Sequence, residues 1–144
     1  MKLLWLLPIL WSFFGLNNPA EKGELVLRVN NIEQAGGMVW VGVYDCQNNF
    51  LIQENATLVH GVNVDKRGEL VMKLDAIPYG TYAIAVFHDE NNSGYLDQNF
   101  IGIPLEPYSF SVPYSSKWRV PKFEDVKFEF NHPNQVVETE LGRW

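Results

Sequence analysis

The feature that most constrains the fold is an alternation of apolar and polar residues with a period of two. In residues 24–30, Leu25, Leu27 and Val29 fall on one face, and charged or polar residues fall mainly on the other. Successive side chains of a β-strand point to opposite faces, so this pattern predicts a strand with one buried face. The same alternation occurs in four further segments: 38–45, 69–75, 126–130 and 135–141. A shift of one residue would turn each apolar set toward water, so the pattern also predicts which face is buried.

Turn-forming residues separate the predicted strands. They occur at five places: Ala35-Gly36-Gly37, Lys66-Arg67-Gly68, Pro78-Tyr79-Gly80, Asn92-Ser93-Gly94 and His132-Pro133-Asn134. Only residues 49–55 are compatible with a helical turn, because no segment shows a sustained period of 3.6. Seven to eight short strands with turns at this spacing predict an all-β fold, an immunoglobulin-like or transthyretin-like antiparallel β-sandwich.

Length, composition and charge narrow the class of protein. A chain of 144 residues has room for one ordinary domain. With 47% hydrophobic and 19% charged residues it is globular rather than disordered. Its net charge of −6, with scattered basic residues, excludes a nucleic-acid partner. A single cysteine, Cys46, excludes a disulfide framework and a cysteine-rich zinc site.

Residues 1–20 have the pattern of a secretion signal. Lys2 supplies one positive charge, residues 3–16 are almost entirely apolar, and no further charge occurs before Glu21. The apolar run is shorter than the roughly 20 residues that cross a bilayer. We therefore predict a signal peptide over 1–20, a single β-sandwich domain over 21–144, and an exported protein, periplasmic or extracellular, without a transmembrane span after cleavage. The alternative is an uncleaved anchor.

The most chemically pointed part of the sequence is residues 87–97, called here the Asp-rich segment. Oxygen-bearing groups recur at alternate positions around Gly94, and calcium binds six to eight such oxygens. The candidate ligands for Ca²⁺ are Asp89, Asn91, Ser93, the Tyr95 carbonyl and Asp97. A further oxygen would come from Glu106, Glu124, Asp125 or water. The alternative is a polar turn, for which the same residue types are typical.

At this segment the chain resembles a known family. The likeness is carried by residues 85–91 (AVFHDEN) and 94–111 (GYLDQNFIGIPLEPYSFS), with further matches at 43–45, 78–83 and 123–126. These motifs closely resemble the bacterial secreted family called domain of unknown function 2141, over about residues 24–141. The resemblance implies an exported β-sandwich without an assigned function. The Asp-rich segment also loosely resembles the calcium loops of sandwich repeats on bacterial surface adhesins.

Residues 104–122 combine four prolines with aromatic and basic side chains. One interpretation is an extended loop whose aromatics cap the open end of the sandwich. The other is a surface for a small ligand or glycan, since ordered aromatics offer large contact area at low entropic cost. The candidate contacts are Tyr108, Tyr114 and Trp118, with Lys117, Arg119 and Lys122 beside them. Exposure of Tyr114 and Trp118 around a groove would favour ligand binding.

No motif for an enzymatic reaction stands out. The three histidines, His60, His88 and His132, have no zinc-binding spacing, and no nucleophile or phosphate-loop motif is present. A hydrolase would need two carboxylates from Asp89, Asp97 and Asp125 across an open cleft. We therefore predict a non-enzymatic, monomeric binding or structural module, with Ca²⁺ as a candidate cofactor. Its partner would be an envelope or extracellular protein, or a glycan.

Overall fold

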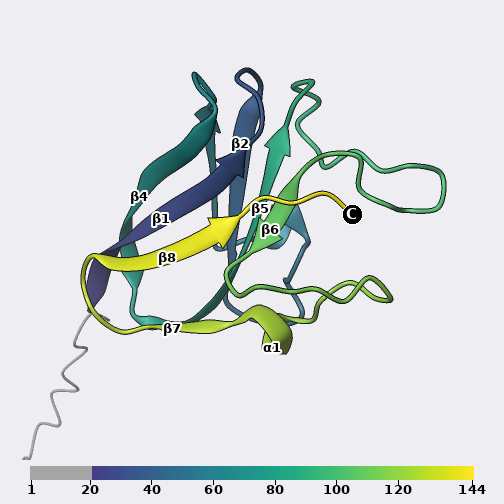
Figure 1. Ribbon diagram of the computed structural model, residues 1–144. Helices are drawn as coiled ribbons and strands as arrows, with labels where there is room; N and C mark the ends of the chain where they lie inside the picture. The colour runs from purple at the N-terminus through teal and green to yellow at the C-terminus, as the bar shows by residue number, and fades with distance from the viewer. Residues whose placement is uncertain (1–20) are drawn as a thin grey trace, which may run out of the picture.

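The computed structural model describes residues 21–144, which form a two-layered β structure (Figure 1). The predicted signal peptide lies outside the described residues. The strands are β1 (Lys22–Ile32), β2 (Met38–Tyr44), β3 (Leu58–Asn63), β4 (Gly68–Pro78), β5 (Gly80–Asp89), β6 (Tyr108–Phe110), β7 (Phe128–Phe130) and β8 (Gln135–Glu140). Two short helices accompany them: the 3-10 turn η1 (Gln53–Asn55) and α1 (Phe123–Val126). No helix within 21–144 is long and apolar enough to cross a membrane.

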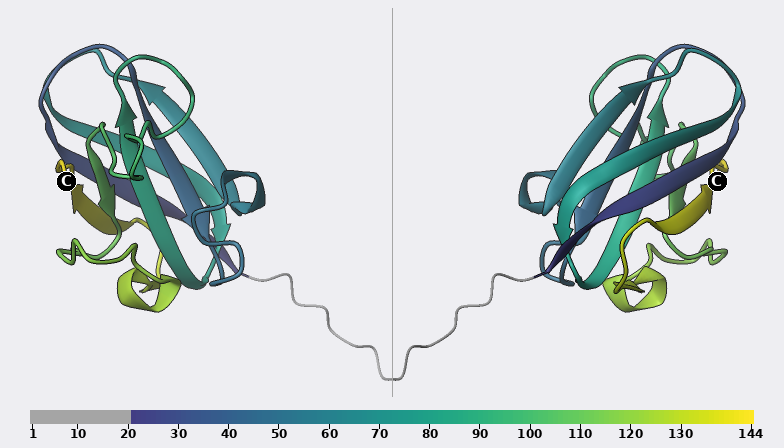
Figure 2. Two further views of the ribbon diagram at one scale, coloured as in Figure 1. Left: turned by 90° about the vertical axis from the view of Figure 1, so that its right-hand side faces the viewer. Right: turned by 90° about the vertical axis from the view of Figure 1, so that its left-hand side faces the viewer.

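The strands form two sheets that face one another (Figures 1 and 2). One sheet has the order β4-β1-β8, and the other has the order β3-β2-β5-β6, with β7 paired to the first residues of β5. The predicted all-β fold with two packed sheets is confirmed, and the immunoglobulin-like or transthyretin-like topology stays a prediction. One pair departs from the antiparallel prediction, since β1 and β8 run parallel from Leu25↔Gln135 to Asn30↔Glu140.

The core between the sheets is built from the faces that alternation predicts. Leu25, Leu27 and Val29 of β1 are fully buried, and they share one cluster with the inward residues of the other strands. These include Val39, Val41, Val43, Met72, Leu74, Ile84, Val86, Phe130, Val137 and Leu141. The prediction of buried faces in β1, β2, β4 and β8 is therefore confirmed.

The predicted strand over 126–130 is correct only in its second half. Residues 123–126 form α1, which buries Phe123 and Val126, and β7 starts at Phe128. The Asp125 carboxylate accepts a hydrogen bond from the Lys122 backbone N–H at 2.7 Å, which closes the first turn of α1. The helical turn expected within 49–55 is present as η1.

A second, smaller cluster covers part of the outer face of the five-stranded sheet. Tyr44 and Ala83 point outward from β2 and β5, and Phe50, Phe123 and Val126 pack over them. The Phe50 ring meets Tyr44 and Phe123 edge to face, with centroids 5.5 and 6.2 Å apart. The cover extends over one end of that face only, which leaves the other end open.

Candidate functional site

The uncovered part of the five-stranded sheet is the floor of an open groove of about 700 Å³. Gly42 and Ala85 lie directly opposite one another on β2 and β5, and the Tyr44 ring lies against Gly42, where an added Cβ atom would come within 2.8 Å of the Tyr44 hydroxyl. Trp40 and Phe87, also a directly opposed pair, supply aromatic surface at the end nearer Asp89. The floor therefore combines small and aromatic residues at outward positions of two central strands.

Trp40 lies over β3 because Gly61 has no side chain. The two residues are paired across the sheet, and a Cβ atom at Gly61 would come within 2.7 Å of the Trp40 ring. The Trp40 indole N–H donates a hydrogen bond to Asp89 Oδ2 at 3.1 Å. Trp40 is thereby held at the boundary between the floor and the loop that follows β5.

One wall of the groove is the segment between β5 and β6, called here the 90–107 loop. Two buried carboxylates organise its backbone. Asp89 accepts hydrogen bonds from the N–H groups of Ser93 and Gly94 at 2.9 and 2.8 Å. Glu106 accepts from Glu90 N at 2.9 Å and from Asp97 N at 3.1 Å. Each carboxylate therefore accepts hydrogen bonds from two backbone donors of this loop.

The other predicted calcium ligands are drawn together by hydrogen bonds. Asn91 donates to Asp97 Oδ2 at 2.6 Å and accepts from the Ser93 N–H at 3.0 Å. The Ser93 hydroxyl donates to the Tyr95 carbonyl at 3.0 Å. Within residues 21–144, no three acidic, histidine or cysteine side chains gather as a metal site would require. Calcium binding stays a prediction.

Of the three proposed additional ligands, only Glu106 reaches this loop. Asp125 lies toward the opposite end of β5, because the adjacent Val126 carbonyl accepts from the Ser111 hydroxyl, which itself accepts from Ile84 N. Five residues separate Ile84 from Asp89, about 16 Å along a strand. Glu124, beside Asp125 on α1, pairs with Lys127.

The same separation bears on the hydrolase alternative. Asp89 is only 1% exposed and is committed to three donors, while Asp125 is remote and paired with Arg119. Asp89 and Asp125 therefore do not face one another across the groove, and Asp97 is not among the residues that line it. His88 points into the sandwich, where its Nε2 donates to the Gly36 carbonyl at 2.7 Å.

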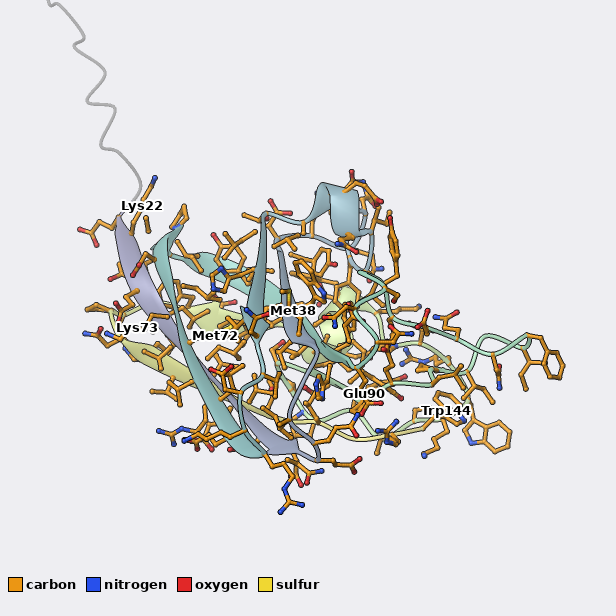
Figure 3. The ribbon with its side chains drawn as sticks, turned by 90° about the horizontal axis from the view of Figure 1, so that it is seen from above. Lys22, Met38, Met72, Lys73, Glu90 and Trp144 are labelled. Atoms are coloured by element: carbon orange, nitrogen blue, oxygen red, sulfur yellow. The ribbon has the colours of Figure 1, made fainter. Side chains whose placement is uncertain are left out.

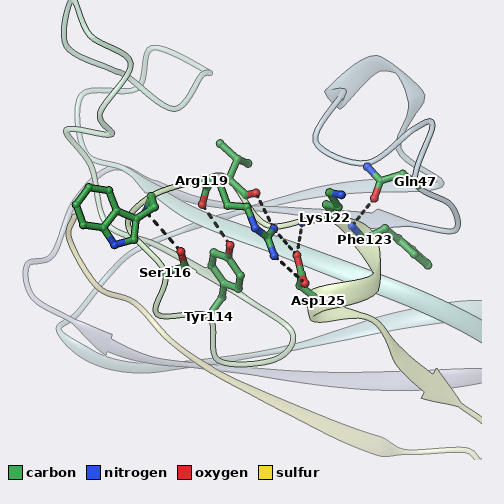
Figure 4. A network of polar contacts seen from close by, with 9 residues as sticks. Gln47, Tyr114, Ser116, Arg119, Lys122, Phe123 and Asp125 are labelled. Atoms are coloured by element: carbon green, nitrogen blue, oxygen red, sulfur yellow. Dashed lines mark hydrogen bonds and ion pairs between the residues drawn. The ribbon is translucent and has the colours of Figure 1, made fainter.

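The second wall is the segment between β6 and α1, called here the 111–122 loop (Figure 4). The Arg119 guanidinium binds both carboxylate oxygens of Asp125, at 2.6 and 3.1 Å. Together with the Lys122 N–H, it lowers the pKa of Asp125 from 3.8 to about 2. Arg119 also lies 5.6 Å from the Tyr114 ring centroid, so one ion pair fixes an aromatic wall residue against α1.

The aromatic residues predicted in 104–122 divide between the two interpretations. Phe110 and Tyr114 pack against the smaller hydrophobic cluster and also line the groove. Trp118 lines the groove but is 97% exposed, so capping of the sandwich by Trp118 is wrong. Burial raises the pKa of the Tyr108 phenol, which therefore stays neutral at physiological pH.

The residues after β8 connect the two walls. Arg143 donates to the Leu105 carbonyl at 2.9 Å and pairs with Glu90 and Glu33. Trp144, at the groove, lies under the Lys117 ammonium at 5.7 Å. Figure 3 shows Glu90 and Trp144 on one side of the molecule, away from Lys22 and Lys73 of the three-stranded sheet.

The sequence predicts Tyr108, Tyr114 and Trp118 at this surface, with Lys117 and Arg119 beside them, but not the lining residues of the strands and of the chain end. Trp40 and Phe87 are aromatic residues at outward positions of strands, where polar residues are typical, and that contrast was an available signal. Ile101 follows Phe100 in an otherwise polar stretch, which was another signal. No sequence signal points to Trp144, because its position at the groove depends on the path of the chain after β8.

The fold and the groove define a β-sandwich with an open, aromatic-lined groove on one sheet. The chain belongs to a family described as uncharacterized proteins conserved in bacteria, DUF2141, whose family model matches residues 27–138. The resemblance seen in the sequence motifs is thereby confirmed. Comparisons with curated proteins and with solved structures find no match.

Proposed function

We propose that the protein is an exported, non-enzymatic binding module that holds a small apolar or amphipathic molecule in its groove. The observation that carries the proposal is the groove itself, about 700 Å³ in volume and lined by aromatic and aliphatic side chains. Pockets that bind small molecules typically measure 300–1,000 Å³ and are mostly apolar with few polar groups. The exposure of Trp118 beside a groove favours ligand binding over capping.

The chemistry of the lining favours an apolar ligand over a glycan. Phe87, Ile101 and Ile103 offer hydrocarbon surface and no side-chain hydrogen-bonding groups. Sugars require polar partners as well as stacking, and Arg119, a charged residue of the lining, is already paired with Asp125. A glycan stacked on Tyr114 and Trp118 is the second candidate, and it would leave the floor empty.

The test places a bulky side chain on the floor of the groove. Ala85→Phe adds a ring at the centre of the groove, and Val71→Phe adds one to the outer face of the other sheet as a control. We expect the wild type and the control to bind N-phenyl-1-naphthylamine with a rise in its fluorescence, and Ala85→Phe to lose at least tenfold in affinity. Equal binding by all three proteins, or none by the wild type, would contradict the proposal.

Export has its own test. The motivation is Lys2 followed by the apolar residues 3–16. Mass spectrometry of the protein from its native host should give an N-terminus between about residues 15 and 24. An intact Met1 on membrane-bound protein would show that the segment is an anchor.

A further inference from the structure

The two loops that flank the groove carry large apolar side chains in almost complete contact with water. Phe100 is 98% exposed and Ile101 64% in the 90–107 loop, and Trp118 is 97% exposed in the 111–122 loop. Figure 1 shows both loops extending from the same side of the sandwich, one above the other. A single exposed apolar residue is ordinary, but exposed aromatic residues on two loops that project from the same side indicate a shared partner.

The tip of the 90–107 loop satisfies four of its backbone donors internally, those of Asn99, Ile101, Gly102 and Ile103. The N–H of Asn99 bonds to the Ile103 carbonyl, and that of Gly102 bonds to the Asn99 carbonyl. The Asn99 side-chain oxygen accepts from the N–H groups of Ile101 and Ile103, both at 3.0 Å. These bonds lower the free-energy cost of moving the tip from water to the less polar surface of a bilayer.

We propose that the two loop tips insert into the surface of a lipid bilayer. Phe100 and Ile101 supply apolar side chains on a hydrogen-bonded tip, and Trp118 supplies an amphipathic ring of the kind enriched at membrane interfaces. Lys117 precedes Trp118, and its ammonium, which lies over the Trp144 ring, can stay at the level of the headgroup phosphates. The groove lies between the tips and would open toward the bilayer surface.

A bilayer fits this surface better than a protein does. The exposed apolar groups stand on separate projecting tips with a hollow between them, whereas a protein interface is usually one continuous packed patch. A fluid lipid surface adapts to two separate points. With a net charge of −6, the chain as a whole has no general attraction to anionic lipids, so binding must come from apolar insertion.

The test is sedimentation of the purified protein with phosphatidylcholine vesicles. We expect the wild type to bind, with little change between 0.05 and 0.5 M salt, because insertion is apolar. Phe100→Ser and Trp118→Ser should each weaken the partition by about tenfold, and the double variant should not bind. Val136→Ser removes an exposed apolar residue from the outer face of the three-stranded sheet and should bind like the wild type.

Several results would overturn the proposal. They are absence of wild-type binding, unchanged binding by Phe100→Ser, or binding that 0.5 M salt abolishes. Analytical ultracentrifugation in the absence of vesicles tests a further outcome. A wild-type dimer that dissociates in Phe100→Ser would show that the tips bind a second copy of the chain. The test is separate from that of the groove, because Phe100 lies outside the groove lining. Ala85→Phe should bind the fluorescent probe more weakly but still bind the vesicles.

Discussion

At the scale of single residues, the Arg119–Asp125 pair carries a pH dependence with a defined sign. Asp125 has its pKa lowered to about 2, first by the side-chain hydrogen bond from Arg119 and then by the Lys122 N–H. Above about pH 5 the carboxylate is charged in both the folded and the unfolded chain, so the pair contributes fully. As the pH falls from 3.8 toward 2, the unfolded chain takes up a proton that the folded chain does not, and the contribution is lost.

The prediction concerns Asp125→Asn. We expect its melting temperature to lie below that of the wild type at pH 7 and the difference to shrink steadily between about pH 4 and pH 2. The matched control is Glu124→Gln, which removes a neighbouring carboxylate of α1 that pairs with the exposed Lys127. A gap between wild type and Asp125→Asn that stays constant down to pH 2 would show that the ion pair is not its source.

Asp89 is the residue whose role differs most from its sequence-based interpretation. The sequence offers it as a candidate calcium ligand, and in the structure it is buried and accepts from Trp40, Ser93 and Gly94. Asp89→Asn would turn an amide NH₂ toward these donors. We expect it to lower the free energy of unfolding by about 1–3 kcal/mol in urea, because buried donors lose an acceptor. The exposed control Asp65→Asn should change it by less than about 0.5 kcal/mol.

At the scale of elements, the Asp-rich segment has two interpretations, a calcium-binding loop and a polar turn. The calcium prediction requires the melting temperature to rise by roughly 5–10 °C at a hundredfold excess of calcium over its dissociation constant. Thermal scans in 10 mM calcium and in chelator measure this directly. Equal melting temperatures would mean that calcium does not stabilise the loop and that its carboxylate–amide hydrogen bonds alone hold its conformation.

The strands show which elements a sequence can predict and why. Alternation locates β1, β2, β4 and β8 because each buries one face against the same core. It extends the strand of 126–130 too far, since Val126 is buried from a helical turn just as it would be from a strand. It passes over β3, an edge strand with Gly61 and His60 in its middle, where burial is weak.

The loops show what a sequence cannot predict, because nothing in the sequence distinguishes the buried aromatic residues of 104–122 from the exposed ones. Trp118→Ala should change the free energy of unfolding by less than about 0.5 kcal/mol, as expected for an exposed side chain. Phe130→Ala, at a fully buried position, should cost about 3–5 kcal/mol. Chemical denaturation compares the two. A loss of several kcal/mol in Trp118→Ala would restore the capping interpretation.

At the scale of the whole molecule, the path of the chain creates both the parallel pair and the groove. After β7, which pairs with β5, the chain crosses to the other sheet and enters β8 beside β1 in the parallel direction. The residues after β8 then return to β6, where Tyr108 and Gly142 exchange two backbone hydrogen bonds of 3.0 Å. No local pattern encodes such a return, because its partners are separated by more than thirty residues in sequence.

Arg143 tests whether this return also holds the groove in shape. Its guanidinium connects the end of the chain to the Leu105 carbonyl, Glu90 and Glu33. Arg143→Gln should therefore speed amide hydrogen exchange in the 90–107 loop, because that loop loses a fixed contact. Its effect on the free energy of unfolding should stay within about 1 kcal/mol, since the pairs are partly exposed.

The control and the contrary outcome come from the same measurement. Arg28→Gln removes an arginine that pairs with Glu69 and Glu138 on the other sheet, and it should leave exchange in the 90–107 loop unchanged. If the groove depends on a fixed loop, Arg143→Gln should also bind the fluorescent probe several-fold more weakly, because the ligand must then order the wall. Unchanged exchange in Arg143→Gln would mean that Asp89 and Glu106 alone hold the loop, and the groove would be fixed from within one segment rather than by the path of the whole chain.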